Sequence, residues 1–362
     1  MAFHDQNSVN SSVLSDSKRP TVKQKNSSMS NLQAAAEPTN DPFYGLSFKV
    51  GVAENKNVTY RAKMEDVHTY VANFAEKLDW GYFAIFDGHA GKQTARWCGN
   101  NLHTLLEHEI ISNEDGNSNN LPNQGNEVDN SAPLSSKCFM QDYLNTTFIK
   151  ADELIEKEKN GSAGCTAAVA VLTWETDDSN VSAESSQPPE INGGFDFMPS
   201  PNHRRMLYTS NVGDLRIVLY RKGKSYRLTY DHKATDSNEI NRIRDSGGLI
   251  MKNRVNGVLA VTRSLGDSYM KDLVIGNPFT TATEITDEDE FMILACDGVW
   301  DVISDIKACQ FVAETFKKDG DDPQLAAKKL CQLAMDNSTT DNVTVMIVKF
   351  DRKVFTSQQN TV

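Results

Sequence analysis

The sequence lacks any long apolar run. Its longest uninterrupted apolar stretches have six residues, far fewer than the roughly 20 that a helix needs to cross a bilayer. The first five residues, MAFHD, contain neither the apolar segment of a secretory signal nor the Met-Gly start of an acylation motif. We therefore expect a protein without a membrane span or a lipid anchor.

The sequence also lacks an excess of positive charge. It has 37 Lys and Arg residues against 49 Asp and Glu residues, which gives a formal net charge of −12. A nucleic-acid-binding surface needs a basic patch, so we expect no nucleic-acid partner. The acidity leaves a phosphorylated substrate open, because bound metal ions can supply positive charge locally.

The motifs of several large enzyme classes are missing. There is no Walker A loop, no Gly-x-Ser-x-Gly elbow and no His-Arg-Asp kinase loop. None of the six cysteines belongs to a Cys-x-x-Cys pair, and none is followed six positions later by Arg. These absences argue against zinc or thioredoxin-like chemistry and against the thiol–phosphate loop of cysteine-dependent phosphatases. Most of the cysteines lie among apolar neighbours, which is typical of core thiols in a reducing compartment.

Composition separates one expected domain from several polar segments. Residues 1–42 are rich in Ser, Asn, Gln and Lys and poor in aromatics, which predicts a disordered N-terminal tail. The stretches near 112–136 and 175–203 have the same character and interrupt segments with clear periodicity, so we interpret them as polar insertions. The expected domain spans 43–351 and is followed by a C-terminal tail at 352–362.

Short apolar runs bounded by turn residues predict buried strands, and apolar residues at helical spacing predict helices. The order of these elements differs from the alternation of a parallel Rossmann sheet. It favours an α+β fold with two antiparallel sheets flanked by helix pairs. The expected strands are 48–53, 67–74, 80–86, 165–174, 205–210, 216–220, 291–296 and 343–350. The expected helices are 92–111, 139–157, one that begins after a Ser304 cap and one that begins at Asp322-Pro323.

Aspartates stand at the ends of three expected strands. Asp87-Gly88 and Asp297-Gly298 each follow an apolar run, and Asp341 precedes another. Glycine permits a tight turn that aims an aspartate out of the strand, although Asp-Gly is also ordinary turn chemistry. Three such carboxylates together indicate a site for a hard cation such as Mg²⁺ or Mn²⁺, which prefers oxygen ligands.

Arg61, Glu65 and Asp66 precede the second expected strand. Arg61 and Glu65 point to the same face of an extended segment, so they could form a surface ion pair. Arg is equally suited to grip a phosphate with two parallel N–H donors. Glu65 and Asp66 could then hold waters bound to metal ions.

His89 stands two residues after Asp87. A lone His beside a Gly is commonly a polar surface residue. Next to a metal-binding aspartate it could instead protonate a leaving oxygen. A bridging Asp87, flanked by Asp297 and Asp341, would complete a two-metal site that activates water.

In this order, the motifs resemble those of the metal-dependent protein Ser/Thr phosphatases of type 2C, the PPM family. The resemblance covers about residues 43–351, and the core is similar to small fungal members that damp stress MAP-kinase signalling. The matching motifs are Arg61-Ala62-Lys63-Met64-Glu65-Asp66, Phe86-Asp87-Gly88-His89-Ala90-Gly91, Gly164-Cys165-Thr166-Ala167, Asn211-Val212-Gly213-Asp214, Asp231-His232-Lys233, Leu259-Ala260-Val261-Thr262-Arg263-Ser264-Leu265-Gly266-Asp267, Ala295-Cys296-Asp297-Gly298-Val299-Trp300-Asp301 and Asp341-Asn342-Val343-Thr344.

The resemblance implies a four-layer αββα sandwich with the metal site in a cleft between the sheets. It also implies that Arg61 binds the substrate phosphate, that His89 is the general acid and that Asp87 bridges two metal ions. The other implied ligands are the Gly88 carbonyl, Asp297 and Asp341 directly, Glu65 and Asp66 through water, and Asp214 and Asp301 at a third, weaker metal position.

The implied activity is hydrolysis of phosphoserine and phosphothreonine in proteins, with two Mn²⁺ or Mg²⁺ ions per subunit. The implied partners are phosphorylated proteins, among them MAP kinases or their regulators, and the implied setting is a monomer in the cytoplasm and nucleus. Two alternatives stay open: a pseudophosphatase that only binds, and a metal nuclease. A pseudophosphatase should lack metal-ligating carboxylates, but every expected carboxylate is present in this sequence. A nuclease should carry a basic face, but this sequence is acidic.

Overall fold

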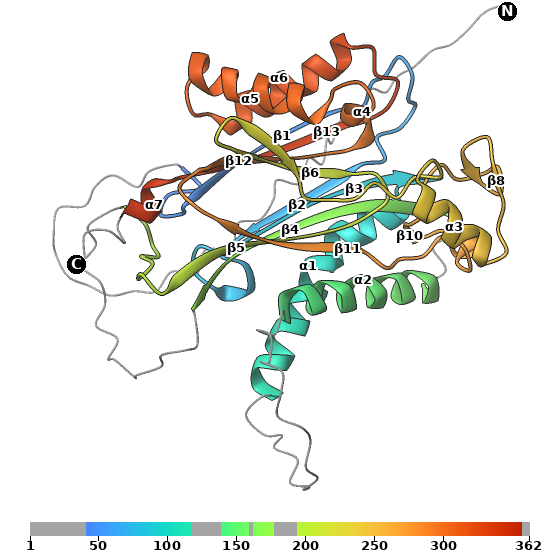
Figure 1. Ribbon diagram of the computed structural model, residues 1–362, viewed down its shortest axis with the longest axis horizontal. Coiled ribbons are helices and arrows are strands. Elements are labelled where there is room, and N and C mark those ends of the chain that lie inside the picture. The colour runs from blue at the N-terminus through green and yellow to red at the C-terminus, as the bar shows by residue number, and fades with distance from the viewer. Residues whose placement is uncertain (1–40, 117–138, 159–161, 177–193, 357–362) are drawn as a thin grey trace, which may run out of the picture. The chain divides into compact units, whose positions relative to one another are not determined.

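The computed structural model describes four stretches of the chain, drawn in colour in Figure 1. Nearly all of these residues belong to one unit, Phe43–Val362. Residues 1–40 of the expected tail, and the greater part of both expected insertions, lie outside the described residues. The described residues are 41–116, 139–158, 162–176 and 194–356.

Two antiparallel sheets form the centre of the fold (Figure 1). The first sheet contains β1 Phe48–Asn55, β6 Arg216–Arg221, β7 Lys224–Arg227, β12 Asp289–Ala295 and β13 Val343–Phe350. The second contains β2 Val67–Ala72, β3 Gly81–His89, β4 Gly164–Thr176, β5 His203–Val212, β10 Leu265–Gly266 and β11 Phe279–Ile285. Their strand orders are β1-β13-β12-β6-β7 and β11-β5-β4-β3-β2, with β10 beside β4. A small hairpin pairs β8 Ile250–Met251 with β9 Arg254–Val255.

Helices cover the outer faces of both sheets (Figure 1). Helices α1 Gln93–Gly116 and α2 Phe139–Lys157 pack on the second sheet, and α5 Asp305–Asp319 and α6 Pro323–Asp336 pack on the first. The remaining helices are α3 Ser237–Asp245, α4 Asp297–Trp300 and α7 Lys353–Thr356, with short 3₁₀ turns at Phe74–Glu76 and Ser268–Met270. None of the helices in the described stretches is long and apolar enough to cross a membrane.

Side chains that alternate along each strand build three separate cores. In β3, Phe83 and Ile85 pack between the sheets, whereas Tyr82, Ala84 and Phe86 pack against α1 and α2. Strand β12 divides its side chains in the same way between the inter-sheet core and the core beneath α5 and α6. Because both faces of each sheet are buried, these strands are continuous apolar runs in the sequence. The expected four-layer αββα sandwich is confirmed.

Local signals in the sequence placed several helices correctly. The Ser304 hydroxyl accepts a hydrogen bond from the Lys307 N–H at 3.3 Å at the start of α5, and the Asp322 carboxylate accepts one from the Gln324 N–H at 2.8 Å at the start of α6. Pro323 occupies the first turn of α6, where no intrahelical donor is needed. The expected apolar stripes on α1 and α2 are buried, except for Leu105, which is partly buried. The buried residues are Ala95, Cys98, Leu102, Leu106, Ile110, Met140, Leu144, Phe148, Ala151 and Ile155.

The largest departure from expectation concerns β3. The sequence predicted that this strand ends at 86 and that Gly88 forms a turn, but β3 continues to His89. Asp87, Gly88 and His89 are paired in register with Thr166, Cys165 and Gly164 of β4. The expectation of a turn was wrong, because the partner strand β4 extends far enough to keep these polar residues in the ladder.

Other boundaries also differ. The strand expected at 67–74 ends at Ala72, and α1 continues to Gly116, which lies inside the expected insertion. In the expected C-terminal tail, 353–356 form α7, whose Val354 is buried. Strands β7 and β11 and helix α3 were not expected, because their mostly polar residues show no apolar period that would distinguish them from loops.

A buried polar cluster ties the two sheets together at the end of β4 that holds Trp174. Arg205 of β5 and Asp79, just before β3, belong to the second sheet, and Ser47, which bonds to both, directly precedes β1 of the first. Arg205 and Asp79 approach to 3.2 Å, and their side chains are 2% and 1% exposed. Asp79 also accepts hydrogen bonds from the Ser47 hydroxyl at 2.6 Å and from the Trp174 indole N–H at 2.9 Å. The Arg205 guanidinium lies 4.6 Å from the centroid of the Trp174 ring. Every charged group in this cluster therefore has a partner, which a buried charge requires.

We expect Asp79→Ala to lower the free energy of unfolding by about 3–5 kcal/mol, because it leaves Arg205 buried without a countercharge. Urea unfolding followed by circular dichroism measures the loss. The matched control is Asp321→Ala, which removes an exposed partner of Lys349 and should cost less than about 1 kcal/mol. Equal effects of the two substitutions would contradict the role assigned to the buried pair.

Candidate metal centre and active site

The expected site residues meet where the ends of the two sheets come together. Asp66 directly precedes β2 and Asp87 lies near the end of β3, both in the second sheet. Asp297 follows β12 as the first residue of α4, and Asp341 precedes β13. The strands β12 and β13 both belong to the first sheet. Residues from four separate parts of the sequence therefore converge on one end of the sandwich.

Glycines allow the chain segments to approach closely here. A Cβ atom at Gly88 would lie 2.7 Å from the Glu65 carbonyl oxygen, closer than side chains tolerate. A Cβ at Gly298 would collide with the backbone carbonyl of Asn342. The glycines after Asp87 and Asp297 are thus required for packing of one backbone segment on another. They do not serve the tight turn that the sequence suggested for Gly88.

Asn342 fixes the segment that carries Arg61, Glu65 and Asp66. Its amide oxygen accepts a hydrogen bond from the Glu65 N–H at 2.9 Å. Its amide nitrogen donates to the carbonyl of Lys56 at 2.8 Å and to that of Lys63 at 3.0 Å. Asn342 belongs to one of the matching motifs, but no pattern in the sequence indicated this structural role.

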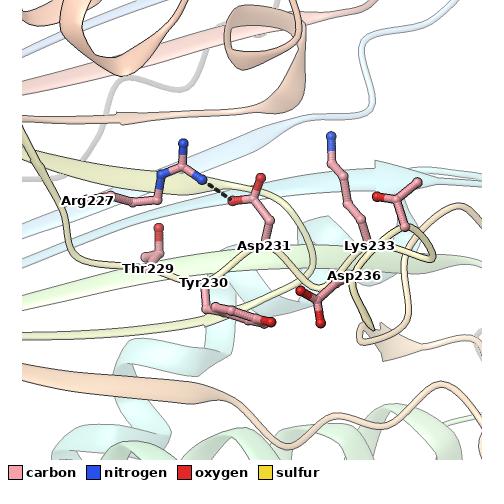
Figure 2. Close-up of a pocket in the computed structure, with 7 residues that line it drawn as sticks. Arg227, Thr229, Tyr230, Asp231, Lys233 and Asp236 are labelled. Atoms are coloured by element: carbon pink, nitrogen blue, oxygen red, sulfur yellow. Dashed lines mark hydrogen bonds and ion pairs between the residues drawn. The ribbon is translucent and has the colours of Figure 1, made fainter. Parts of the chain in front are cut away.

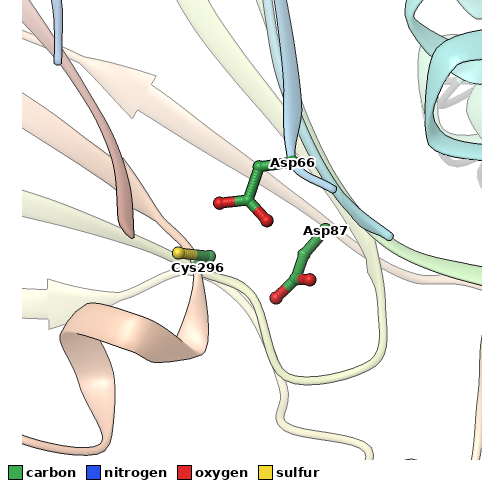
Figure 3. Close-up of side chains that lie close together, drawn as sticks. All are labelled: Asp66, Asp87 and Cys296. Carbon is green, nitrogen blue, oxygen red and sulfur yellow. The ribbon is translucent and has the colours of Figure 1, made fainter. Parts of the chain in front are cut away.

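Asp66, Asp87 and Cys296 lie close together (Figure 3). One ligand-type atom from each lies within 4.8 Å of the others. The Asp66 side chain is buried, and its Oδ2 accepts a hydrogen bond from the Thr344 hydroxyl at 2.7 Å. Its Oδ1 has no hydrogen-bond partner among the described residues, and neither does the buried Oδ1 of Asp297. Such unpartnered carboxylate oxygens fit a cation.

Burial and mutual repulsion perturb these carboxyl groups. Burial raises the pKa of Asp66 to about 6. Burial, and after it the charges of Asp66 and Asp297, raise the pKa of Asp87 well above its ordinary value. Burial and the charges of Asp214 and Asp341 do the same to the pKa of Asp297. A divalent cation would favour the ionised form of all three, so the residues present fit a metal ion.

Cys296 is better described as a neutral thiol than as a metal ligand. Burial, and then the neighbouring charges of Asp66 and Asp87, raise the pKa of its thiol well above the ordinary value. Its Sγ donates to the Asn342 carbonyl at 3.4 Å and accepts from the Thr344 N–H at 3.2 Å. The sequence predicted a core cysteine, which its complete burial confirms, but gave no sign that it lies against the carboxylates.

Arg61 lies beside a metal-ligand candidate. Its guanidinium forms an ion pair with Asp341 and donates through Nε to the Thr340 carbonyl at 3.2 Å. Its side chain is 45% exposed. The alternative of a surface ion pair with Glu65 is not what forms, because Arg61 pairs with Asp341. Arg61 thus lies at the edge of the carboxylate cluster, paired with one of its members.

His89 has a partner that sequence analysis missed. Its Nε2 lies 2.6 Å from Oδ2 of Asp267, which is completely buried. Asp267 also accepts a hydrogen bond from the Ser264 hydroxyl at 2.5 Å. A Cβ at Gly164 would collide with both His89 and Asp267, so glycine there leaves room for the pair. The only signal in the sequence was that Gly164 and Asp267 fall within matching motifs.

Asp214 and Asp301, expected at a third metal position, already share a cation. The Lys233 ammonium lies 3.2 Å from Asp214 and 3.0 Å from Asp301. The opposing effects of its burial and of these two carboxylates leave the pKa of Lys233 raised. A metal ion at this position would have to compete with Lys233, which sequence analysis did not assign.

Lys233 also lines a pocket of about 340 Å³ beside the carboxylates (Figure 2). Figure 2 shows Arg227 paired with Asp231 at the opposite side of this pocket. Arg227 pairs with Asp305 at 2.7 Å as well. The two cations of this pocket are therefore already engaged with carboxylates.

Comparisons with known proteins agree with this geometry. The sequence profile of the family described as Protein phosphatase 2C matches residues 50–343. Protein phosphatase 2C homolog 1 of Saccharomyces cerevisiae is 51% identical over 320 residues, which cover 88% of this chain and 99% of the yeast protein. The protein of the same description from Schizosaccharomyces pombe is 38% identical over 313 residues, covering 86% of this chain and 76% of that one.

A solved structure supports the fold. The crystal structure of a phosphatase from Toxoplasma gondii superimposes with a TM-score of 0.62 at 21% identity, covering 85% of this chain and 94% of the other. The chain described here belongs to the protein phosphatase 2C family. Its enzyme class is protein serine/threonine phosphatase, and the family is metal-dependent.

The raised carboxyl pKa values predict a pH dependence of stability in the metal-free protein. The folded form binds protons more tightly than the unfolded chain, so stability is present at low pH and is lost as pH rises through the folded-state pKa values. In EDTA, the urea midpoint should fall as pH rises from about 4 to about 6, the range between the ordinary pKa of Asp66 and its folded-state value, and should go on falling above that range because the pKa values of Asp87 and Asp297 are raised further. Asp87→Asn should make this fall smaller. Asp321→Asn, an exposed control, should leave it unchanged. A fall of equal size in wild type and Asp87→Asn would refute this assignment.

Proposed function

We propose that this protein hydrolyses phosphoserine and phosphothreonine in phosphorylated proteins, with two Mn²⁺ or Mg²⁺ ions held by carboxylates at the sheet ends. The observation that carries the proposal is the convergence of Asp66, Asp87, Asp297 and Asp341, whose charges perturb one another, beside Arg61. A set of oxygen ligands with unpartnered atoms suits hard divalent cations.

Each expected site residue has a proposed task. Asp87 would bridge the ions, and the Gly88 carbonyl, Asp297 and Asp341 would be further direct ligands. Glu65 and Asp66 would act through water, and Asp214 and Asp301 would form a third, weaker position in competition with Lys233. Bound divalent ions neutralise phosphate charge and lower the pKa of an attacking water.

Arg61 would orient the phosphate. Its guanidinium can donate two parallel N–H groups to phosphoryl oxygens. In the structure the same group is engaged by Asp341, so substrate binding requires Arg61 to exchange a carboxylate partner for the phosphate. The Asp341 carboxylate and the substrate phosphate would therefore compete for the same Arg61 guanidinium.

His89 would protonate the departing serine or threonine oxygen. Its Nε2 faces the Asp267 carboxylate, which orients the ring and leaves Nδ1 as the nitrogen able to deliver a proton. Asp267 acts through His89 and is a positioning residue. The Gly164 position, which has no room for a side chain, keeps the two in contact.

The cellular role is a finer proposal, supported by the resemblance to small fungal members of the family. On that basis, the protein would be a monomer of the cytoplasm and nucleus that dephosphorylates stress-activated MAP kinases or their regulators. Incubation of the purified protein with a phosphorylated MAP kinase, followed by phosphosite-specific immunoblotting, tests the substrate. Persistence of every phosphosite under conditions where a phosphopeptide is hydrolysed would remove that substrate class.

Turnover of p-nitrophenyl phosphate should vanish after EDTA treatment and return with Mn²⁺ or Mg²⁺. Asp87→Asn should lower it by more than about 100-fold, since loss even of outer partners of a metal site costs about 10- to 100-fold. Single-stranded DNA should stay intact under the same conditions, which separates the proposal from a metal nuclease. Full turnover without metal, or in Asp87→Asn, would contradict the carboxylate site.

His89→Ala should slow hydrolysis of a phosphoserine peptide by about 10²- to 10⁴-fold, because a poor leaving group needs a proton. Hydrolysis of p-nitrophenyl phosphate, whose leaving group needs none, should change much less. Across a series of aryl phosphates, the slope of log kcat against leaving-group pKa should steepen in His89→Ala. Asp267→Asn should show a weaker form of the same change. Parallel lines for wild type and His89→Ala would rule out the general-acid role.

A further inference from the structure

A second pocket, of about 490 Å³, lies at the start of α1 and is distinct from the carboxylate cluster. Three of its lining residues are cations, and the other side chains are an aromatic ring and three amides. Gly91 also contributes to the wall. The three cations are Lys63, Lys92 and Arg96, and Trp97, Asn100 and Asn101 line the same pocket.

The three cations of this pocket form no ion pair with a carboxylate of the described residues. Across the described part of the chain, no carboxylate lies within ion-pair distance of Lys63, Lys92 or Arg96. Lys92 acts only at longer range on Glu54, whose carboxylate is hydrogen-bonded to His68 at 2.7 Å. The pocket at Lys233 differs, since its cations are paired. In a chain with a net charge of −12, three unpaired cations around one cavity are a local exception.

The arrangement of these cations opposes the stability of the helix. The Arg96 N–H donates to the Lys92 carbonyl at 2.9 Å, so the two like charges lie one turn apart, which costs a few tenths of a kcal/mol (about 0.2–0.5). Both also stand at the positive end of the α1 dipole, where anions are favoured and cations are not. Folding alone gains nothing from this placement. A bound anion would offset both interactions, because it attracts the two cations and is itself favoured at this end of the dipole.

The pocket adjoins the residues proposed to bind the scissile phosphate. Lys63 lies two positions from Arg61 and two from Glu65, and two residues of chain span at most about 7 Å. The Lys63 backbone is fixed by its hydrogen bond from Asn342. On the other side, Gly91 follows His89 by two residues. An anion in this pocket is therefore close enough to belong to the same peptide as the phosphate being hydrolysed.

We infer that this pocket binds a second phosphoryl group of a multiply phosphorylated peptide substrate. The inference rests on the proposed phosphatase function and names the substrate class of that site. A phosphomonoester carries a charge of about −1.5 to −2 and three acceptor oxygens, which matches three cations better than a single carboxylate does. Arg96 supplies a planar fork for two of those oxygens, and Lys63 and Lys92 supply mobile ammonium donors.

The test compares peptides that differ at one residue. Each carries one phosphoserine, and about two to four residues away lies a serine, a glutamate or a non-hydrolysable phosphonate analogue of phosphoserine, a spacing of up to roughly 14 Å. Because the phosphonate cannot be cleaved, phosphate release reports one site only. The wild-type kcat/KM should be about tenfold or more higher for the phosphonate peptide than for the serine peptide, as expected for one or more charge-assisted hydrogen bonds.

The variants isolate the pocket from net charge. Lys92→Gln/Arg96→Gln should abolish the preference for the phosphonate peptide and leave kcat/KM for the serine peptide and for p-nitrophenyl phosphate within about twofold, because a lost charge-assisted contact affects only the ligand that makes it. Lys63→Gln should weaken the preference. The control Lys317→Gln/Lys328→Gln removes the same charge from exposed positions on α5 and α6 and should keep it.

Each outcome decides the inference. A preference that disappears only in the pocket variants supports it. A preference retained in Lys92→Gln/Arg96→Gln overturns it, and so does an equal loss on all substrates, which would indicate general electrostatic steering. If wild type hydrolyses the serine and phosphonate peptides equally well, the pocket inference fails and the proposed function stands. If it hydrolyses no phosphopeptide, both fail.

Discussion

The rest of the structure depends on the crowding of carboxylates at one end of two stacked sheets. Asp66 and Asp87 come from one sheet and Asp297 and Asp341 from the other, and their burial and repulsion raise the carboxyl pKa values where a shift is resolved. Such a cluster is unfavourable unless positive charge is nearby. The protein supplies part of that charge itself, through Arg61 beside Asp341 and Lys233 between two further aspartates. Divalent ions would supply the remaining positive charge and bind the carboxylate oxygens that have no hydrogen-bond partner among the described residues.

A rigid scaffold keeps these repelling groups in place. The three apolar cores fix the strands, and hydrogen bonds from Ser47, beside β1, to the buried pair of Arg205 and Asp79 join the sheets at the end away from the site. At the site itself, Asn342 holds the segment before β2 through three hydrogen bonds. Small residues at positions such as Gly88 let these backbones approach. Groups held by packing on strands and by outer hydrogen bonds are placed more accurately than groups on unsupported loops.

The distribution of charge connects the proposed hydrolysis with the proposed second phosphate. An acidic chain with an acidic site repels an anionic substrate at long range. The bound ions and Arg61 would act on the scissile phosphate itself. Lys63, Lys92 and Arg96 line a cavity whose positive charge is not paired with carboxylates of the described residues, unlike the cations that line the pockets at Lys233 and at Arg216. Specificity for a multiply charged peptide would follow from that placement and need no change in the chemistry.

The sequence by itself determined the main strands and helices of the sandwich and pointed to the candidate site residues, because their signals are local. Apolar runs, helical stripes and caps such as Ser304 act within a few residues, and the aspartates beside glycine stood out for the same reason. Only the tertiary structure decided what those residues contact. His89 meets Asp267 across 178 positions, and the ladder with β4 carries β3 through Asp87 where the sequence suggested a turn. Contacts of this kind are set by how the sheets stack, and no local pattern of residues encodes that stacking.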